Sequence, residues 1–203
     1  MGGGNAGGRD NGWPDQRDRE EHYATFPHMT VIENDAHRID PLGPDDILHY
    51  EQLALEIYQL LSDEHTLKFL PQKKLASVTA AQDWLSAAIL NFHSGRNQVH
   101  LIRSKKTGAL LGVIDVIPPA VAREHYQLAE YPFFLEFYLK GSARGQSLMS
   151  RLLPKVISHL QRDGIDEVAA VVNRQNIPAA KVLRRAGFKL SGTFDHAQDL
   201  YCC

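Results

Sequence analysis

Residues 133–149 read Phe-Phe-Leu-Glu-Phe-Tyr-Leu-Lys-Gly-Ser-Ala-Arg-Gly-Gln-Ser-Leu-Met. The aromatic and aliphatic run over 133–139 predicts a β-strand, and a loop with two glycines follows it. From Leu148 the apolar residues recur at helical spacing, which predicts a helix. The first amides of such a helix lack an intrahelical acceptor, and the helix dipole favours negative charge there. The turn is therefore a candidate pyrophosphate site, to which Arg144 adds a positive charge.

Two familiar phosphate motifs do not fit this turn. A Walker loop ends in Gly-Lys-Ser or Gly-Lys-Thr, whereas Gln146 and Ser147 follow the glycine here. The dinucleotide fingerprint needs three spaced glycines, which the turn lacks. An ordinary turn between a strand and a helix is the alternative interpretation.

The next segment continues the same alternation of helix and strand. Gly164 is expected to end the helix, and the apolar run 167–172 predicts a buried parallel strand. A short second helix then has signals at both ends. Asn176 is a good N-cap, Pro178 is tolerated in the first turn, and Gly187 suits the position after the last turn.

Two motifs in this region resemble those of the GNAT N-acetyltransferase superfamily. Residues 144–149 resemble its acyl-CoA pyrophosphate loop, and 173–188 resemble its next motif, with Asn173, Asn176 and a closing Gly-Phe. The spacing is most similar to the branch of ribosomal-protein alanine and serine N-acetyltransferases. The resemblance covers roughly residues 37–203. It implies an α/β acyl-CoA N-acyltransferase fold, with a mixed, mostly antiparallel, splayed sheet flanked by helices.

Composition bounds the remaining possibilities. The chain has 203 residues, of which 43% are hydrophobic, enough for one core. We expect a disordered, glycine-rich tail over 1–28 and one acetyltransferase domain over 29–203. A formal charge of −2 gives no case for nucleic acid, and no apolar run is long enough for a membrane span. Cys202 and Cys203 are the only cysteines, which fits a reducing cytoplasm. The histidines have no metal-ligand spacing.

The part of the chain before residue 133 predicts strands and helices in the order that the resemblance implies. We expect strand residues at 30–32 and 37–39, a helix over 44–61, and a linker over 63–70. A second helix follows a cap at Ser77 or Thr79. A hairpin joins strands at 98–102 and 109–117, and Pro118 and Pro119 end the second of them.

The resemblance implies direct transfer of an acetyl group from acetyl-CoA, as cosubstrate, to a primary amine, without a metal. The oxyanion donor is then expected on the backbone near Tyr138 and Leu139. The residues expected to bind the cosubstrate are Leu139, Arg144, Gly145, Gln146, Ser147, Leu148, Met149 and Asn176. For Asn176, a simple helix cap is an equally compatible interpretation.

The general base is less clearly marked in the sequence. The position at which family members often carry glutamate is Phe134 here. Glu136 lies two residues further, so strand alternation places it on the same face. Glu136 is therefore the candidate base or substrate anchor, and a charge on a solvated strand face is the alternative.

The general acid is equally open. Relatives carry a hydroxyl where this chain has Ala179 or Leu183. Tyr138 and Tyr201 are the remaining candidates, although a buried tyrosine often serves packing alone. Direct transfer needs no covalent nucleophile, so the cysteines are not required.

The acceptor is the last open question. An α-amine has a pKa near 8 and a lysine amine one near 10.4, so an α-amine costs about 3 kcal/mol less to deprotonate. The resemblance to the ribosomal-protein branch implies a protein or peptide α-amine as acceptor. We also expect a monomer or homodimer. A small amine, such as an antibiotic or an amino-acid derivative, is the alternative. Ser147, Ala179 and Phe134 depart from the family pattern and leave a non-catalytic acyl-CoA-binding module as a third possibility.

Overall fold

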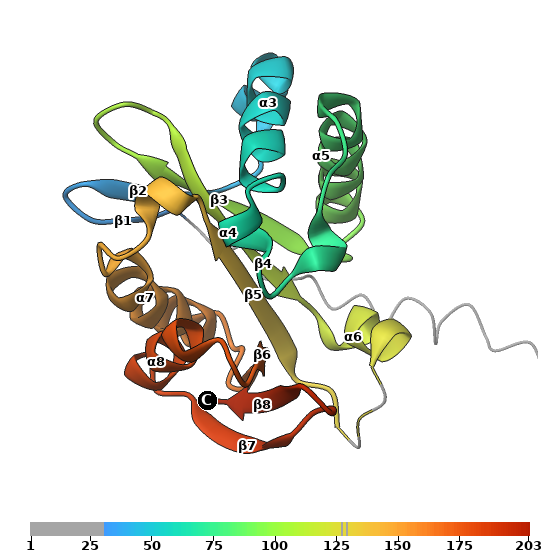
Figure 1. Cartoon of the computed structure of the whole chain (residues 1–203), viewed down its shortest axis with the longest axis vertical. Helices are drawn as coiled ribbons and strands as arrows, with labels where there is room; N and C mark the ends of the chain where they lie inside the picture. Colours follow the sequence, from blue (N-terminus) through green and yellow to red (C-terminus); the bar gives the residue numbers. More distant parts are fainter. Residues whose placement is uncertain (1–30, 127, 129) are drawn as a thin grey trace, which may run out of the picture.

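The protein folds into one open sheet with helices on both faces (Figure 1). The computed structural model describes residues 31–126, 128 and 130–203. The expected tail over 1–28 lies outside these residues. The strands are β1 (Ile32–Glu33), β2 (His37–Pro41), β3 (Gln98–Ser104), β4 (Leu110–Ile117), β5 (Phe133–Leu139), β6 (Val168–Asn173), β7 (Lys189–Thr193) and β8 (Gln198–Cys202). The helices are α2 (Pro44–Leu48), α3 (Tyr50–Leu60), α4 (Glu64–Leu67), α5 (Val78–His93), α6 (Pro119–His125), α7 (Leu148–Arg162) and α8 (Ile177–Arg185), with short 3₁₀ turns η1 (Pro71–Lys73) and η2 (Gly141–Ala143).

The sheet has the order β1-β2-β3-β4-β5-β6-β8-β7. Every described pair is antiparallel except β5 with β6, which run parallel. That parallel pair is short, with only Phe133 opposite Val168 and Phe134 opposite Ala169. Among the described residues, no strand pairs with this edge of β5 beyond Phe134. The two strands therefore separate, and the sheet is splayed between them, as the sequence predicts.

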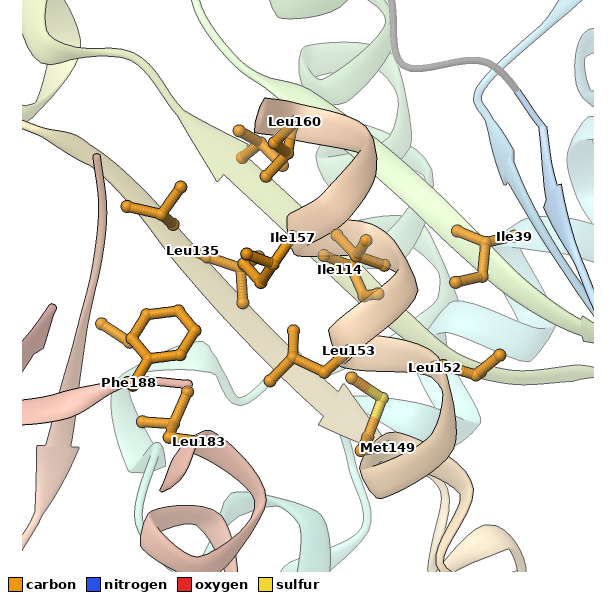
Figure 2. Close-up of a cluster of buried hydrophobic side chains, with 14 of the residues drawn as sticks. Ile39, Ile114, Leu135, Met149, Leu152, Leu153, Ile157, Leu160, Leu183 and Phe188 are labelled. Carbon is orange, nitrogen blue, oxygen red and sulfur yellow. The ribbon is translucent and has the colours of Figure 1, made fainter. Parts of the chain in front are cut away.

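One face of the sheet is covered by α7 and α8. Figure 2 shows Leu153 and Ile157 of α7 packed toward Leu135 of β5, with Leu183 and Phe188 closing the cluster from α8 and the residues after it. Leu153 is completely buried. The helical spacing of apolar residues from Leu148 onward thus matches the buried stripe of α7.

The opposite face is covered by α3 and α5, whose buried residues pack on β3, β4 and Tyr138 of β5. Alternation along β5 separates the two faces. Leu135 and Phe137 join the α7 core, whereas Phe134 and Tyr138 join the cores on the other side. Residue 136 follows the same alternation, so Glu136 lies on the α5 side, as strand geometry predicts.

Three details differ from the sequence-based expectations. The predicted helix over 44–61 breaks at His49 into α2 and α3, and Ile47 is 49% exposed rather than part of the core. The predicted linker contains α4, because Asp63 caps it by accepting a hydrogen bond from the Thr66 amide. Pro118 and Pro119 do end β4, but they also begin α6, since proline is favoured at the first helical position.

Candidate active site

The predicted phosphate turn forms as a tight loop between β5 and α7. Gly145 and Ser147 both adopt positive φ, at 72° and 56°. Among the described residues, Ser147 is the only non-glycine residue in this conformation. A side chain there costs about 1–2 kcal/mol relative to glycine, and such strain is concentrated at functional sites. The strain lies at the position where the family has a loop glycine.

The loop leaves the first amides of α7 available for a ligand. The first intrahelical hydrogen bond runs from the Arg151 amide to the Ser147 carbonyl. The amides of Leu148, Met149 and Ser150 precede it and have no acceptor within the helix. These amides and the positive helix end favour an anion.

A cavity of about 600 Å³ opens beside this loop. Its walls come from the end of β5 (137–139), the loop and first turn of α7 (143–150 without Gln146), α8 with the residues before it, and α4 with the residues after it. The wall residues of the last two groups are Gln175, Asn176, Pro178, Ala179 and Val182, and His65, Thr66, Lys68, Phe69 and Leu70. The wall residues of β5 lie beyond Phe134, where β5 no longer pairs with β6. The splay of the sheet and the amide-rich loop thus form one site.

Most of the residues expected to bind the cosubstrate line this cavity. The exception is Gln146, whose Nε2 donates to the Ser142 carbonyl at 2.8 Å and points back into the loop. Asn176 lines the cavity and also caps α8, since its Oδ1 accepts from the Ala179 amide at 3.3 Å. Both interpretations of Asn176 therefore hold geometrically.

The end of β5 turns its backbone toward the cavity. The Lys140 amide donates to the Leu111 carbonyl of β4 at 2.8 Å. Because hydrogen-bonding direction alternates along an antiparallel strand, Leu139 and Phe137 direct their peptide groups away from β4, toward the splay. Thr66 Oγ1 already lies 2.9 Å from the Leu139 carbonyl oxygen. A ligand in the cavity would meet this free strand edge.

Tyr138 and Tyr201, the two candidate acids, lie in different places. Tyr138 lines the cavity, and burial, Asp115 and Glu136 raise the pKa of its hydroxyl well above the ordinary value. It therefore stays protonated near neutral pH. Tyr201 lies in β8 opposite Ala170 of β6, is buried in the α7 core, and is not part of the cavity wall.

A second group of polar side chains lies on the α5 side of the sheet, where Lys73 approaches the ring of Tyr138 in the cavity wall; we call it the carboxyl cluster. It consists of Asp115, Glu136, Lys73 and Asn97. Lys73 Nζ contacts Glu136 Oε2 at 2.5 Å, and both side chains are about a quarter exposed. Asp115 stands directly opposite Glu136 in the β4–β5 ladder and accepts from Asn97 Nδ2 at 2.8 and 2.9 Å. Glu136 is therefore a partly buried carboxylate with an ion-pair partner.

An aromatic group borders the carboxyl cluster. The Tyr126 ring packs on Phe134 at 4.9 Å between centroids and meets Phe194 edge-on at 5.3 Å. Burial, Glu136 and Asp115 raise the pKa of Tyr126 to about 12. Tyr126 follows α6, Phe134 lies in β5 and Phe194 follows β7, so three distant segments of the chain form this aromatic group.

Residues 45–189 match the family described as Acetyltransferase (GNAT) domain. The chain belongs to this family. It is therefore an acetyltransferase by family, and its sheet, splay and helices are those of the GNAT fold. No curated protein matches the chain in sequence.

Solved structures share the fold at low sequence identity. A ribosomal-protein alanine acetyltransferase from Vibrio fischeri superposes with a TM-score of 0.66 at 13% identity, covering 86% of this chain and 96% of its own. RimL, a ribosomal alpha-N-protein acetyltransferase in complex with coenzyme A, gives 0.61 at 20%, covering 85% and 97%. The microcin self-immunity acetyltransferase MccE, in complex with acetyl-CoA and AMP, gives 0.64 at 14%, covering 84% and 93%.

Another hollow of the GNAT domain, of about 890 Å³, lies among α7, β7 and the chain end and contains none of the predicted site residues. Cys202 and Cys203 line it. Burial raises the pKa of Cys202 and raises that of Cys203 to about 11, so neither thiol is activated near neutral pH.

Within the described part of the chain, no helix has the length and apolar character that a bilayer crossing requires. Nor do any three His, Cys, Asp or Glu side chains of those residues gather where they could hold a metal ion.

Sequence reasoning missed three residues near the site. Thr66 lies in the segment that the sequence predicted only as a linker, and Lys73 lies just after it, where no element was predicted. Asp115 had a detectable signal, since it is the one charged residue in the otherwise apolar β4. An acidic residue in a buried strand needs partners or a raised pKa.

Asp115 yields a prediction about stability. Burial first, and then the Glu136 charge, raise the pKa of Asp115 to about 7. The folded chain then holds this proton between about pH 4 and pH 7, where the unfolded chain has released it. Stability contributed by this group therefore falls as pH rises through that window. The upper bound is about 4 kcal/mol, since one pKa unit corresponds to about 1.4 kcal/mol.

We expect the Asp115→Asn substitution to abolish this fall in stability with rising pH. Urea unfolding should show the variant gaining stability over the unmodified chain at about pH 8, and gaining less or nothing at about pH 4.5. Asp83→Asn, at an exposed position on α5, is the matched control. An equal difference between variant and parent at both pH values would contradict the raised pKa.

Proposed function

We propose that the chain transfers an acetyl group from acetyl-CoA to a primary amine, and that this amine is the α-amine of a protein or peptide. The observation that carries the proposal is the cavity that joins the amide-rich loop to the free edge of β5. A phosphate-bearing head and an extended thioester arm need these two surfaces next to each other. Membership of the GNAT family supports the same reaction class.

The donor would be held by the loop and the strand edge. The amides of residues 148–150 and the Arg144 guanidinium face the diphosphate, and Lys68 adds a second cation to the wall. The Leu139 peptide, on the free edge, donates to the carbonyl oxygen that becomes negative in the transition state. Asn176 meets the pantetheine arm from the opposite wall.

The carboxyl cluster would receive the acceptor. Glu136 anchors the incoming ammonium and accepts its proton, and the neutral amine attacks the thioester carbonyl. The Tyr138 hydroxyl, which lines the cavity, then donates to the departing thiolate. We leave Tyr201 out of this scheme because it is buried in the α7 core, whereas Glu136 and Tyr138 lie on the other face of the sheet. Ala179 lines the cavity but brings no hydroxyl.

The acceptor assignment rests on energetics and on neighbours of the same fold. A site whose candidate base is a carboxylate favours an amine that costs less to deprotonate, and an α-amine costs about 3 kcal/mol less than lysine. Two structural neighbours are ribosomal-protein acetyltransferases, one of them an alpha-N-protein acetyltransferase. MccE, which was solved with AMP, keeps small amines as the second candidate class.

Release of free thiol from acetyl-CoA over a panel of amines tests the proposal. The panel should pair short peptides with free α-amines against the same peptides blocked at the α-amine but carrying lysine, and against aminoglycosides and amino acids. Activity confined to free α-amines is the expected result. Activity confined to small amines would show that the acceptor is a small amine rather than a peptide α-amine. Tight CoA binding with no thiol release would leave a binding module.

A further inference from the structure

The chain places one of its own amines where the acceptor amine is expected. Lys73 is the last residue of η1, between α4 and α5, and forms an ion pair with Glu136 of β5. Its Nζ lies 2.5 Å from Glu136 Oε2 and 5.9 Å from the centroid of the Tyr138 ring. That ring is part of the cavity wall. A primary amine thus pairs with the candidate base and lies beside a residue of the cavity wall, while Lys73 and Glu136 themselves are not wall residues.

We propose that Lys73 is an acetylation site of the chain itself, modified in cis from the bound thioester. This inference rests on the proposed function, because it uses the same donor site and the same carboxylate.

Proximity outweighs the disadvantage of a lysine amine. Near neutral pH, the deprotonated fraction of a lysine amine is about two orders of magnitude smaller than that of an α-amine. The ion pair with Glu136, partly exposed, lowers it by up to about fivefold more. A well-oriented intramolecular reaction gains an effective concentration of about 10⁵–10⁸ M. A tethered lysine can therefore react where a free lysine peptide does not.

The step balances without a further reactant beyond the thioester. Lys73 Nζ gives up a proton to the Glu136 carboxylate, and its lone pair forms an N–C bond to the acetyl carbonyl carbon. The C–S bond breaks, and the thiolate leaves with the electron pair. The attacking nitrogen loses its second proton, which balances the proton taken up by the thiolate, and Glu136 returns its own proton to solvent. The products are an amide on Lys73 and free CoA.

The modification would change the acceptor site. An acetylated Lys73 is neutral and cannot form an ion pair with Glu136. The carboxylate is then released to bind the ammonium of an external acceptor. Lys73 therefore occupies the place of the acceptor amine beside Glu136 until acetylation removes its charge.

Other lysines serve as internal controls. Lys68 also lines the cavity, but its Nζ lies over the Phe69 ring at 5.3 Å and its side chain belongs to the phosphate side of our scheme. Lys105 is exposed and pairs with Glu33 at 2.6 Å, at the β1–β2 end of the sheet. Chemical acetylation by the thioester alone should label Lys105 at least as readily as Lys73.

The test is incubation of the purified chain with acetyl-CoA, followed by proteolysis and mass spectrometry over time. We expect Lys73 to be labelled at least about a hundredfold faster than Lys105, at a rate independent of chain concentration. Labelling should disappear in Lys73→Arg, which retains the positive charge beside Glu136, and in Arg144→Glu, which should lose the donor.

The other outcomes overturn the inference. Lys73 left unmodified, or labelled no faster than Lys105, refutes it whatever the acceptor panel shows. Preferred labelling of Lys68, or a rate that rises with chain concentration, refutes modification in cis at Lys73. Thiol release to peptides in the same preparations reports separately on the proposed function, so the two failures are distinguishable.

Discussion

The Glu136→Gln variant should lose at least about a hundredfold of kcat/KM for its amine acceptor, the effect expected for removing a general base. Glutamine keeps the shape of the side chain but can neither accept the proton nor balance the charge of Lys73, which is 2.5 Å away. Steady-state thiol release with a peptide α-amine measures the change. The donor KM should stay close to that of the parent, since the loop around Arg144 is not altered.

A matched variant separates chemistry from general charge loss. Glu33→Gln removes the partner of Lys105 in an exposed ion pair of 2.6 Å and should leave kcat/KM unchanged. The pH profile gives a second readout. If Glu136 only supports the fold, its loss should lower the melting temperature and leave the surviving activity with the same pH profile, and that result would remove Glu136 from the mechanism.

Gly112→Ala should damage both the fold and the site. Gly112 of β4 stands opposite Leu139. A Cβ at this position would lie 2.5 Å from the Tyr138 carbonyl oxygen and 2.6 Å from Leu139 Cδ2. The backbone oxygen cannot move aside without moving β5. We expect unfolding to become easier by about 1–3 kcal/mol, as for other overpacked sites, and thiol release to fall at least about tenfold as the strand edge shifts.

Gly192→Ala provides the control for this prediction. An added Cβ at Gly192, in β7, meets no atom within 4 Å, and its φ is not positive. Chemical denaturation and thiol release for the two variants should therefore diverge. A Gly112→Ala variant as stable and as active as Gly192→Ala would contradict the close approach of β4 and β5 at this point.

Local sequence signals were enough for the central part of the fold. The aromatic run predicted β5, the glycine loop and helical spacing predicted the start of α7, and Asn176 with Gly187 bracketed α8. Each of these features is encoded within a few neighbouring residues, as caps, turns and periodicity are. The loop and cap residues of the cavity could be predicted for the same reason.

The acceptor side depends on contacts that no local pattern contains. Lys73 and Glu136 are 63 residues apart in sequence and meet only because η1 packs over β5. Asp115 faces Glu136 because of the β4–β5 register, which a single strand does not specify. Short helices are also hard to predict, because they contain too few residues for a periodic pattern. The four residues of α4 follow a single recognisable signal, the N-cap Asp63.

The direction of individual side chains also could not be predicted from the sequence. Gln146 belongs to the predicted loop, yet its side chain bonds back to Ser142 and leaves the cavity wall. Tyr201 had the right chemistry for an acid but lies between β6 and β7 in the core. A residue's place in a sequence motif does not determine whether its side chain points into the cavity.

The central claim is that the turn between β5 and α7 binds the diphosphate of acetyl-CoA. Calorimetric titration of acetyl-CoA into the chain, into Arg144→Glu and into Arg162→Glu tests it directly. Arg162 ends α7 at its opposite end and serves as the charge-matched control. We predict micromolar binding by the parent and by Arg162→Glu, and at least about tenfold weaker binding, or about 1.4 kcal/mol, by Arg144→Glu. No binding by the parent, or equal binding by all three, would contradict the account.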